Sequence, residues 1–422
     1  MRGHLSIIRL AFASALTVLC TAFCAAQGTG VLIDNLRSMR VEVNGVWNSA
    51  PVATMDRGNR VVISFDDLQH NYVRYTYRVT HCNADWTESD IPESDYMDGF
   101  NGSRIEKYAP SMNTAMLYNH YTLTFPNEDV RLKISGNYRV DIFEDGDDEP
   151  VAYACFSMLE PRVGISATAT GNTDIDAYKS HQQVSFEVNY STYNVNHPET
   201  ELKPVVVQNK RWDTAVSGLR PSYLKTNTLV FSHLKQLIFD AGNEYRRFEI
   251  LDEHVPTMRV ETMRYAEPYY HATIMEDEPR TNYIYDEDQN GRYYVRNGEN
   301  VDNDTESDYF ITHFILRMPE LANGEIYIDG DFTDHRLTED CLMEYDQMEH
   351  AYSVALPLKQ GSYNYQYLFL PDGESYAITA PIEGNFFQTE NEYAIYIYHR
   401  PFGERYDHLV GYAKLNTKDH IR

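Results

Sequence analysis

The chain has 422 residues and a formal net charge of −27. This length is too great for one ordinary hydrophobic core and predicts two or three domains. The strong negative charge repels phosphate backbones, which disfavours nucleic-acid binding, and it also suits an exported soluble protein. The 34 tyrosines favour antiparallel sheets, in which the ring packs while the hydroxyl reaches water.

The amino-terminal residues have the pattern of an export signal. Two arginines precede an apolar run, and small residues follow it, which predicts a signal peptide over residues 1–26 and a mature start near Gln27. A lipoprotein signal fits less well, because Cys24 follows Phe23 instead of a small residue. No later apolar run is long enough to span a bilayer. We therefore expect an exported protein that touches a membrane only through a partner.

Residues 27–160 predict a β-sandwich of the immunoglobulin or fibronectin kind, because short runs of alternating apolar and polar residues end at turn signals. These runs are 36–43, 60–65, 72–81, 120–125, 136–143 and 151–158. The insertion over residues 85–119 is long for a sandwich loop, and long ordered loops are usually functional.

Two more sandwiches are predicted to follow, over residues 161–306 and 307–422, which makes the fold class all-β with tandem sandwiches. The polar, acidic stretch 297–308 predicts a linker or mobile loop between them. Strands from residue 309 onward are ordered as in the carbohydrate-binding modules of glycogen-branching enzymes, which they resemble. Those modules commonly carry an Asn-Trp pair after a Gly-x-Phe turn. Asp334 and His335 take that place here, which argues for a structural copy of the module.

The strand over residues 72–81 ends in a group of side chains suited to chemistry or recognition. They are His81, Cys82, Asn83, Asp85 and Trp86. His81 and Cys82 are residue types of a base and a nucleophile, but neighbours on a strand point to opposite faces, so they do not readily form a pair. A metal site would need a distant third ligand. The simpler interpretation is that His81 and Asn83 cap the strand end while Trp86 anchors the loop on the core.

Three cysteines follow the predicted signal peptide, namely Cys82, Cys155 and Cys341. An odd number argues against a disulfide scaffold. A bridge between Cys82 and Cys155 and buried free thiols both remain open. No metalloprotease, serine-hydrolase, Walker or Cys-x-x-Cys motif is present in the sequence. We therefore expect a protein without enzymatic activity, cofactor or metal site.

Residues 286–291 match the first half of a calcium loop, with acidic or amide side chains at alternate positions before Gly291. The closing glutamate should lie six residues after Gly291, where Asn297 stands instead. This mismatch favours a turn stabilised by Asp and Asn side chains, and it leaves a partial calcium site open.

Arginine and tryptophan lie among aromatic residues at two further places, with Arg211 and Trp212 in the first and Arg246 in the second. Arginine and aromatic residues are favoured at protein interfaces. Pairing of Arg246 with Glu244 or Glu249 inside the fold is the other interpretation.

Several strings, in order along nearly the whole mature chain, together resemble the plug proteins of the type IX secretion system of Bacteroidota. They are Phe65-Asp-Asp-Leu68, Tyr75-x-Tyr-x-x-x-His-Cys-Asn-Ala-Asp-Trp86, Tyr96-x-x-Gly-Phe100, Ser135-Gly-Asn-Tyr138, Gln208-Asn209, Gly242-Asn-Glu-Tyr-Arg-Arg-Phe248 and Asp288-Gln-Asn-Gly291.

The resemblance implies a non-enzymatic periplasmic protein that closes the periplasmic end of a very large outer-membrane translocon barrel. It implies no nucleic-acid partner and no small-molecule substrate. We expect the insertion over residues 85–119 to contribute to the partner surface. The residues that we expect to bind the partner are His81, Asn83, Asp85, Trp86, Tyr96, Phe100, Arg211, Trp212 and Arg246. The alternative function is an exported carbohydrate-binding protein that uses Tyr363 or Tyr365.

Overall fold

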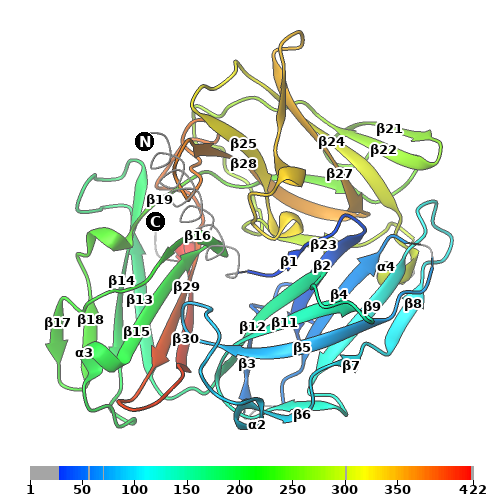
Figure 1. Cartoon of the computed structure of the whole chain (residues 1–422). Coiled ribbons are helices and arrows are strands. Elements are labelled where there is room, and N and C mark those ends of the chain that lie inside the picture. The colour runs from blue at the N-terminus through cyan, green and yellow to red at the C-terminus, as the bar shows by residue number, and fades with distance from the viewer. Residues whose placement is uncertain (1–27, 56–57, 70, 300–301, 420–422) are drawn as a thin grey trace, which may run out of the picture.

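The computed structural model describes residues 28–55, 58–69, 71–299 and 302–419. Three β-sandwiches surround a common centre, as Figure 1 shows, so the predicted all-β fold is confirmed. The α-helices in the described ranges have four residues each, and they are α2 (Glu93–Tyr96), α3 (Pro198–Glu201) and α4 (Asn303–Glu306). None of the described helices could cross a membrane. The predicted signal peptide lies outside the described residues.

The first sandwich packs a six-stranded sheet against a four-stranded one. The six strands are β1 (Gly30–Val31), β3 (Val52–Thr54), β5 (Tyr75–Cys82), β7 (Ser103–Arg104), β11 (Gly136–Glu144) and β12 (Ala152–Leu159). The four strands are β2 (Leu36–Val43), β4 (Val61–Asp67), β8 (Lys107–Pro110) and β9 (Asn119–Phe125). Tyr75, Tyr77 and Val79 point from β5 into the core, as their spacing of two predicts.

The long insertion of the first sandwich is folded onto it. Its strands β7 and β8 extend the two sheets, and β6 (Met97–Gly99) pairs with β10 (Val130–Leu132). The insertion is therefore an ordered part of the domain.

The second sandwich is built from two separate stretches of chain. Its five-stranded sheet contains β13 (Gly164–Thr170), β14 (His181–Asn189), β17 (Tyr223–Lys225), β18 (Thr228–Phe231) and β19 (Ile238–Asp240). Its four-stranded sheet contains β15 (Leu202–Gln208), β16 (Arg211–Val216), β29 (Glu392–His399) and β30 (His408–Asn416). Strand β29 pairs with β15 across nearly two hundred intervening positions, with Ile395 opposite Val206.

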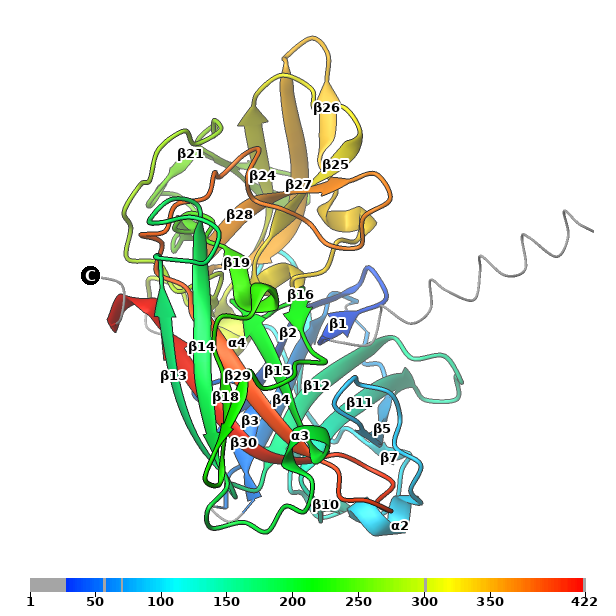
Figure 2. The ribbon, with the colours of Figure 1, turned by 90° about the vertical axis from the view of Figure 1, so that its left-hand side faces the viewer.

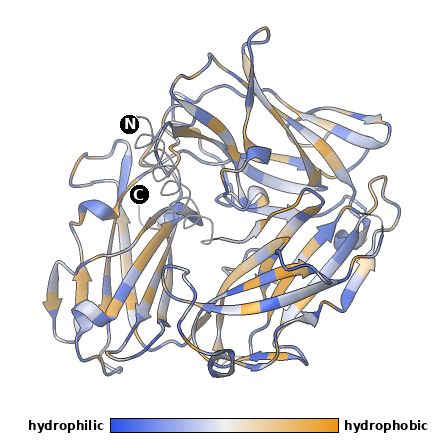
Figure 3. Cartoon of the chain, in the orientation of Figure 1, coloured by the Kyte–Doolittle hydropathy of each residue, from blue (hydrophilic) through white to orange (hydrophobic). Residues whose placement is uncertain are grey.

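The third sandwich lies between β19 and β29 in the sequence. One sheet contains β20 (Arg246–Ile250), β23 (Tyr293–Val295), β25 (Gly324–Asp329) and β28 (Gly361–Pro371). The other contains β21 (Val260–Ala266), β22 (Tyr269–Ile274), β24 (Tyr309–Arg317), β26 (Glu344–Asp346) and β27 (Ala351–Lys359). Figure 3 shows apolar and polar residues alternating along the strands of the three sandwiches.

This strand pairing differs from the consecutive domains predicted over residues 161–306 and 307–422. The third sandwich is inserted into the second, whose last strands return after it. The difference has a simple cause, since alternating polarity shows that a segment is a strand but leaves its neighbour in the sheet unspecified.

The predicted linker over residues 297–308 also differs, because its described residues are packed between the first and third sandwiches. The carboxylate of Asp308 is buried and accepts the backbone N–H of Met116 at 3.0 Å. The hydroxyl of Tyr118 donates to the carbonyl of Ser307 at 2.8 Å. Asp308 and Ser307 of this acidic stretch therefore help to join the first and third sandwiches.

Candidate functional site

The predicted site at the end of β5 is a joint between the first and second sandwiches. His81 is fully buried, and its Nε2 donates to the carbonyl of Ser135 at 3.1 Å, while Nδ1 lies 2.8 Å from the hydroxyl of Ser89. Burial lowers the pKa of His81 to about 4, so the ring is neutral near pH 7. These contacts agree with the capping interpretation. The lowered pKa makes the ring a weak base, and both of its nitrogens are already hydrogen-bonded, so His81 is poorly placed to act as a general base.

The residues after His81 contact the loop between β29 and β30. The backbone N–H of Ala84 donates to Asp407 at 3.0 Å, and Arg400 donates to the side chain of Asn83. Trp86 is 4% exposed and meets Trp212 edge-on, with ring centroids 5.7 Å apart. In this conformation Trp86 is therefore unavailable to a partner.

Asp85 behaves differently from its neighbours. Its side chain is exposed and accepts the backbone N–H of Thr87 at 3.1 Å, which closes a local turn. It keeps one carboxylate at the surface beside the joint.

The insertion has a buried and an exposed side. Tyr96 is 5% exposed and donates its hydroxyl to the carbonyl of Val79 at 3.1 Å. Phe100, in the loop after β6, is 83% exposed. Phe402, in the β29–β30 loop, is 97% exposed, and this loop is tied to α2 by an ion pair between Arg405 and Asp95 at 3.6 Å. In Figure 2 both loops lie at the lower end of the molecule.

Arg211 and Trp212 connect the second sandwich to its neighbours. Arg211 is buried and donates to Asp213 and to the carbonyl of Ala377, which belongs to the third sandwich, at 2.6 Å. Trp212 is partly buried between Trp86 and Tyr396. The aromatic and arginine signal here marks contacts between domains of the same chain.

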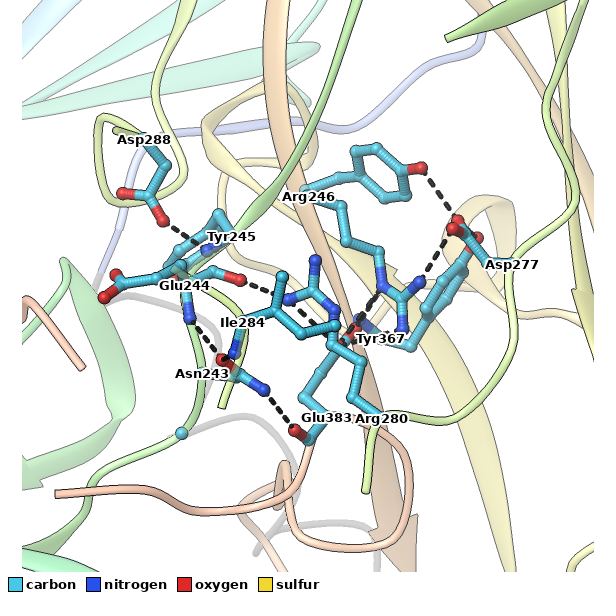
Figure 4. Close-up of polar contacts among 12 residues, drawn as sticks. Asn243, Glu244, Tyr245, Arg246, Asp277, Arg280, Ile284, Asp288, Tyr367 and Glu383 are labelled. Atoms are coloured by element: carbon cyan, nitrogen blue, oxygen red, sulfur yellow. Dashed lines mark hydrogen bonds and ion pairs between the residues drawn. The ribbon is translucent and has the colours of Figure 1, made fainter. Parts of the chain in front are cut away.

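Arg246 is the centre of a buried ionic cluster inside the third sandwich (Figure 4). Its guanidinium donates to Asp277 at 2.7 Å and to Glu383 at 2.9 Å, and it lies over the ring of Tyr367. Asp277 also accepts the hydroxyls of Tyr365 and Tyr367, at 2.8 and 2.9 Å. Arg246 therefore forms ion pairs inside the fold, as the second interpretation expected. Its partners are Asp277 and Glu383, and not Glu244 or Glu249.

Two other carboxyl groups near this cluster lack a cation that balances their burial. Burial raises the pKa of Glu244 to about 7, and its oxygens accept the hydroxyl of Tyr283 at 2.6 Å. Burial likewise raises the pKa of Asp288 to about 7, and this carboxylate accepts the backbone N–H of Asn290 at 2.8 Å. Both groups titrate near neutral pH in the folded chain.

The half calcium loop forms a turn in which protein groups already use the acidic side chains. Asp286 pairs with Arg247, and Asp288 accepts the backbone N–H groups of Tyr245 and Asn290. Among the residues that the structure describes, no three His, Cys, Asp or Glu side chains are grouped to hold a metal ion.

The three cysteines are free thiols, and all three are buried. Burial raises the pKa of Cys82 to about 12, which keeps it protonated and unreactive. Cys82 and Cys155 pack in the same small cluster as Trp86 without a bridge.

The tyrosines considered for sugar binding are in the core of the third sandwich. Tyr363 and Tyr365 are both buried, so in this conformation no sugar ring can stack on them. His335 bridges Asp329 and Asp331 at 3.0 and 2.8 Å. Although burial opposes its charge, these carboxylates raise the pKa of His335 to about 9. The position of the missing sugar-stacking ring is thus occupied by an internal ionic contact.

Of the nine predicted partner-binding residues, the structure exposes Asp85 and Phe100 and leaves Asn83 and Trp212 partly exposed. The buried ones are His81, Trp86, Tyr96, Arg211 and Arg246. Phe402 is an exposed aromatic residue that the sequence analysis missed, since a lone Phe in a Pro-Phe-Gly loop carries no periodic signal.

Comparison with known proteins identifies the family. Residues 36–160 match the family model described as type 9 secretion system plug protein, first domain. A hypothetical protein from Parabacteroides merdae, known from a crystal structure, is 43% identical with a TM-score of 0.91, and the match covers 93% of this chain and 100% of that one. A search of curated proteins found no match.

Two streptococcal matches carry no argument about the fold. The C-terminal domain of the Streptococcus agalactiae AgI/II polypeptide BspA has 6% identity and a TM-score of 0.16, covering 90% of this chain and 99% of that one. That of Streptococcus pyogenes AspA has 7% identity and a TM-score of 0.12, covering 85% and 92%. The family model covers the first sandwich from Leu36 onward, and on this ground the first domain of the chain belongs to the type IX secretion system plug protein family.

Proposed function

We propose that this protein is the non-enzymatic plug that closes the periplasmic end of the type IX translocon barrel in the outer membrane. Membership of the family involves the chain in type IX secretion. The proposal adds that the exported protein is periplasmic and is held at the outer membrane only by the barrel. A body that seals a wide pore must keep its shape under load, and the joints of the three sandwiches supply that rigidity.

The joints carry buried ion pairs, and this observation supports the plug role most directly. Lys359 of the third sandwich is fully buried and lies 2.7 Å from Asp66 of the first. Arg292 of the third lies 2.8 Å from Glu392 of the second, and both are buried. Shifting one sandwich against the other while the joint stays closed would leave one of these charges buried without its partner, which costs several kcal/mol (about 3–5). The pairs therefore favour one arrangement of the three sandwiches over other packed arrangements.

The end of the molecule that carries Phe100 and Phe402 is the proposed contact with the barrel. Large aromatic side chains dominate binding energy at interfaces, and these two are almost fully exposed on neighbouring loops from two sandwiches. Asp85, from the same insertion as Phe100, adds a surface carboxylate. A surface shared by two sandwiches would bind only when their joint is intact.

A pull-down from mildly solubilised outer membranes, quantified by mass spectrometry, tests this proposal. The tagged protein should recover a very large β-barrel in near-equal amount. The double variant Phe100→Ala, Phe402→Ala should recover at least about tenfold less, because each aromatic anchor is worth more than 1 kcal/mol. Met348→Ala is the matched control, since Met348 is 89% exposed but lies in the turn between β26 and β27.

Two results would refute the proposal. Recovery of the protein alone, free in the periplasmic fraction, would exclude a stable complex with the barrel. Full recovery of the barrel by the double variant would move the contact to another face. As a functional readout, cells without the protein should admit large solutes through the open barrel.

A further inference from the structure

A cleft lies between the second and third sandwiches. Its volume is about 490 Å³, whereas the cavity at the junction of all three sandwiches, which is lined by the three tryptophans of the chain, has about 150 Å³. Sites for small ligands usually have about 300–1,000 Å³, so the cleft is large enough for a whole small molecule. Strands β16 and β19 form part of its wall and lie close together below the third sandwich in Figure 2. The third sandwich contributes Tyr245, Gln366 and residues 376–379.

The charged side chains that line the cleft balance one another. They are two cations, Arg211 and Lys235, and two carboxylates, Asp213 and Asp240, beside the titratable His181. Arg211 forms an ion pair with Asp213, and Asp240 lies 3.3 Å from His181. Lys235 is exposed, and its side chain pairs with no residue that the structure describes. An anion would meet two carboxylates and a cation would meet two basic groups, so the cleft favours a neutral ligand.

Three polar groups of the cleft have unused hydrogen-bonding capacity. Arg211 donates through Nε and Nη2, which leaves Nη1 without a partner among the described residues. The hydroxyl of Tyr245 accepts from Nε2 of Gln366 at 3.0 Å, and no described group accepts its proton or donates to Oε1 of Gln366. Burial, together with Asp329, raises the pKa of Tyr245 well above its usual value, so the hydroxyl keeps a proton to donate. The cleft thus offers two donors and one acceptor.

Apolar side chains form another part of the wall. Val216, Ile238 and Phe239 come from the second sandwich, and Ile378 comes from the third. The ring of Tyr376, which also lines the cleft, is 44% exposed and presents an aromatic face to a ligand. Apolar and aromatic walls beside a few polar groups are the usual form of a site that binds a small molecule.

We propose that this cleft binds a saccharide, either as a free sugar or as the end of a glycan. A sugar is neutral, and each of its hydroxyl groups can accept one hydrogen bond and donate another. Its hydroxyls accept from Arg211 and Tyr245 and donate to Gln366, whose groups are unused in the chain itself. The C–H groups on the faces of the sugar ring contact Tyr376 and the aliphatic wall.

Sugar binding at this cleft does not depend on the plug role. The cleft contains no residue of the loops that carry Phe100 and Phe402. It is also separate from Tyr363 and Tyr365, which are buried in the core of the third sandwich. Tyr376→Ala should therefore leave recovery of the barrel unchanged, so sugar binding and barrel binding can fail separately.

The test uses the exported chain, isolated from expressing cells without the barrel and screened on an array of oligosaccharides. Calorimetry then measures the affinity of the best binder and of the methyl glycoside of its terminal unit. Tyr376→Ala should weaken binding about tenfold, because the stacking ring is lost. Tyr245→Phe should weaken it about fivefold, because only the hydroxyl is removed. The control is Tyr223→Ala, whose ring is 51% exposed on β17 at the edge of the second sandwich, and it should leave the affinity unchanged.

Circular dichroism first establishes that each variant is folded, and Tyr376→Ala decides alone if Tyr245→Phe folds poorly, since loss of an exposed ring is tolerated. Equal affinity for the methyl glycoside and the oligosaccharide would identify a single sugar unit as the ligand, and tighter binding of the oligosaccharide would identify a glycan end. Failure of every sugar to bind at millimolar concentration, binding that either folded variant leaves unchanged, or binding of a peptide library in place of any sugar would overturn the proposal.

Discussion

The charge clusters around Arg246 and Lys359 are both buried, but they connect different parts of the molecule. Arg246 joins Asp277 and Glu383 within the third sandwich, whereas Lys359 joins that sandwich to the first through Asp66. The first cluster therefore contributes to the stability of one domain, and the second to the arrangement of two. A rigid assembly of sandwiches needs charge pairs within each domain and charge pairs between domains.

The Lys359 joint is a closed network. Its ammonium donates to Asp66 at 2.7 Å and lies 4.2 Å from the ring centroid of Tyr118. Asp66 also accepts from Tyr309 and His120, at 2.7 and 2.6 Å. Burial alone would raise the pKa of Asp66, but Lys359 and His120 hold it well below its usual range. This contribution to stability is present above the unfolded pKa, about 3.9, and is lost as the pH falls further below it.

The largest effect is expected for Arg246→Ala, which removes the cation from two buried carboxylates. Such a loss costs about 3–5 kcal/mol of unfolding free energy. Urea unfolding followed by circular dichroism measures it. Arg317→Ala is the control, because the pair of Arg317 with Glu276 is exposed, and it should leave the midpoint nearly unchanged. Similar midpoints for the two variants would contradict a stabilising role of the cluster.

Lys359→Ala should be somewhat milder, about 3 kcal/mol, because the tyrosine and histidine donors to Asp66 remain. Its signature differs from that of Arg246→Ala. Tryptophan fluorescence reports the junction, where all three tryptophans lie, and circular dichroism reports the sheets. We expect fluorescence to change at lower urea than circular dichroism in this variant only. Coincident curves would show that the joint and the sandwiches unfold together.

Glu244→Gln tests the opposite kind of buried charge, one that destabilises the folded chain. The folded chain favours the protonated, neutral form of Glu244, whose pKa is raised to about 7. The stability that this form contributes is therefore complete at pH 4 and is lost as the pH rises through 7 and the carboxylate forms. Glutamine keeps an oxygen for the hydroxyl of Tyr283 and removes the charge. The variant should gain about 2 kcal/mol at pH 8 and little at pH 4. An equal change at both pH values would refute this assignment.

The smallest effect on folding is expected for Phe100→Ala, within about 0.5 kcal/mol, since the ring is exposed. Trp86→Ala, in the same insertion, should cost about 3–5 kcal/mol because the buried ring leaves a cavity. Thermal unfolding of both separates a binding residue from a structural one. Loss of barrel recovery by Trp86→Ala would consequently say little about direct contact, whereas loss by a stably folded Phe100→Ala would be informative.

Local patterns predicted most of the strands but few of their partners. The alternation around Tyr75 and Tyr77 is sufficient, because a period of two requires one buried face. It carries no information that β29 returns to β15, which depends on contacts made after both segments have folded. For the same reason the acidic residues 297–308 were predicted to be a linker, although Asp308 is bonded to the first sandwich.

The predicted site residues show the same limit. Arginine beside aromatic residues is typical both of an interface between proteins and of one within a chain. Arg211 and Trp212 belong to the second kind, which only the positions of Ala377 and Trp86 reveal. Phe100 was predicted from its string, and its exposure follows from a loop that turns away from the core.

The sequence by itself determined the all-β class, most strands of the first sandwich and the family of the first domain, because periodicity and ordered strings are local properties. The export signal stays a prediction. Only the tertiary structure decided the insertion of the third sandwich into the second and the burial of Trp86. It also brought three tryptophans and Asp334 to one cavity. These features depend on which surfaces meet. Hydrophobic burial is non-directional, so the local sequence does not specify which surface will cover a given apolar face.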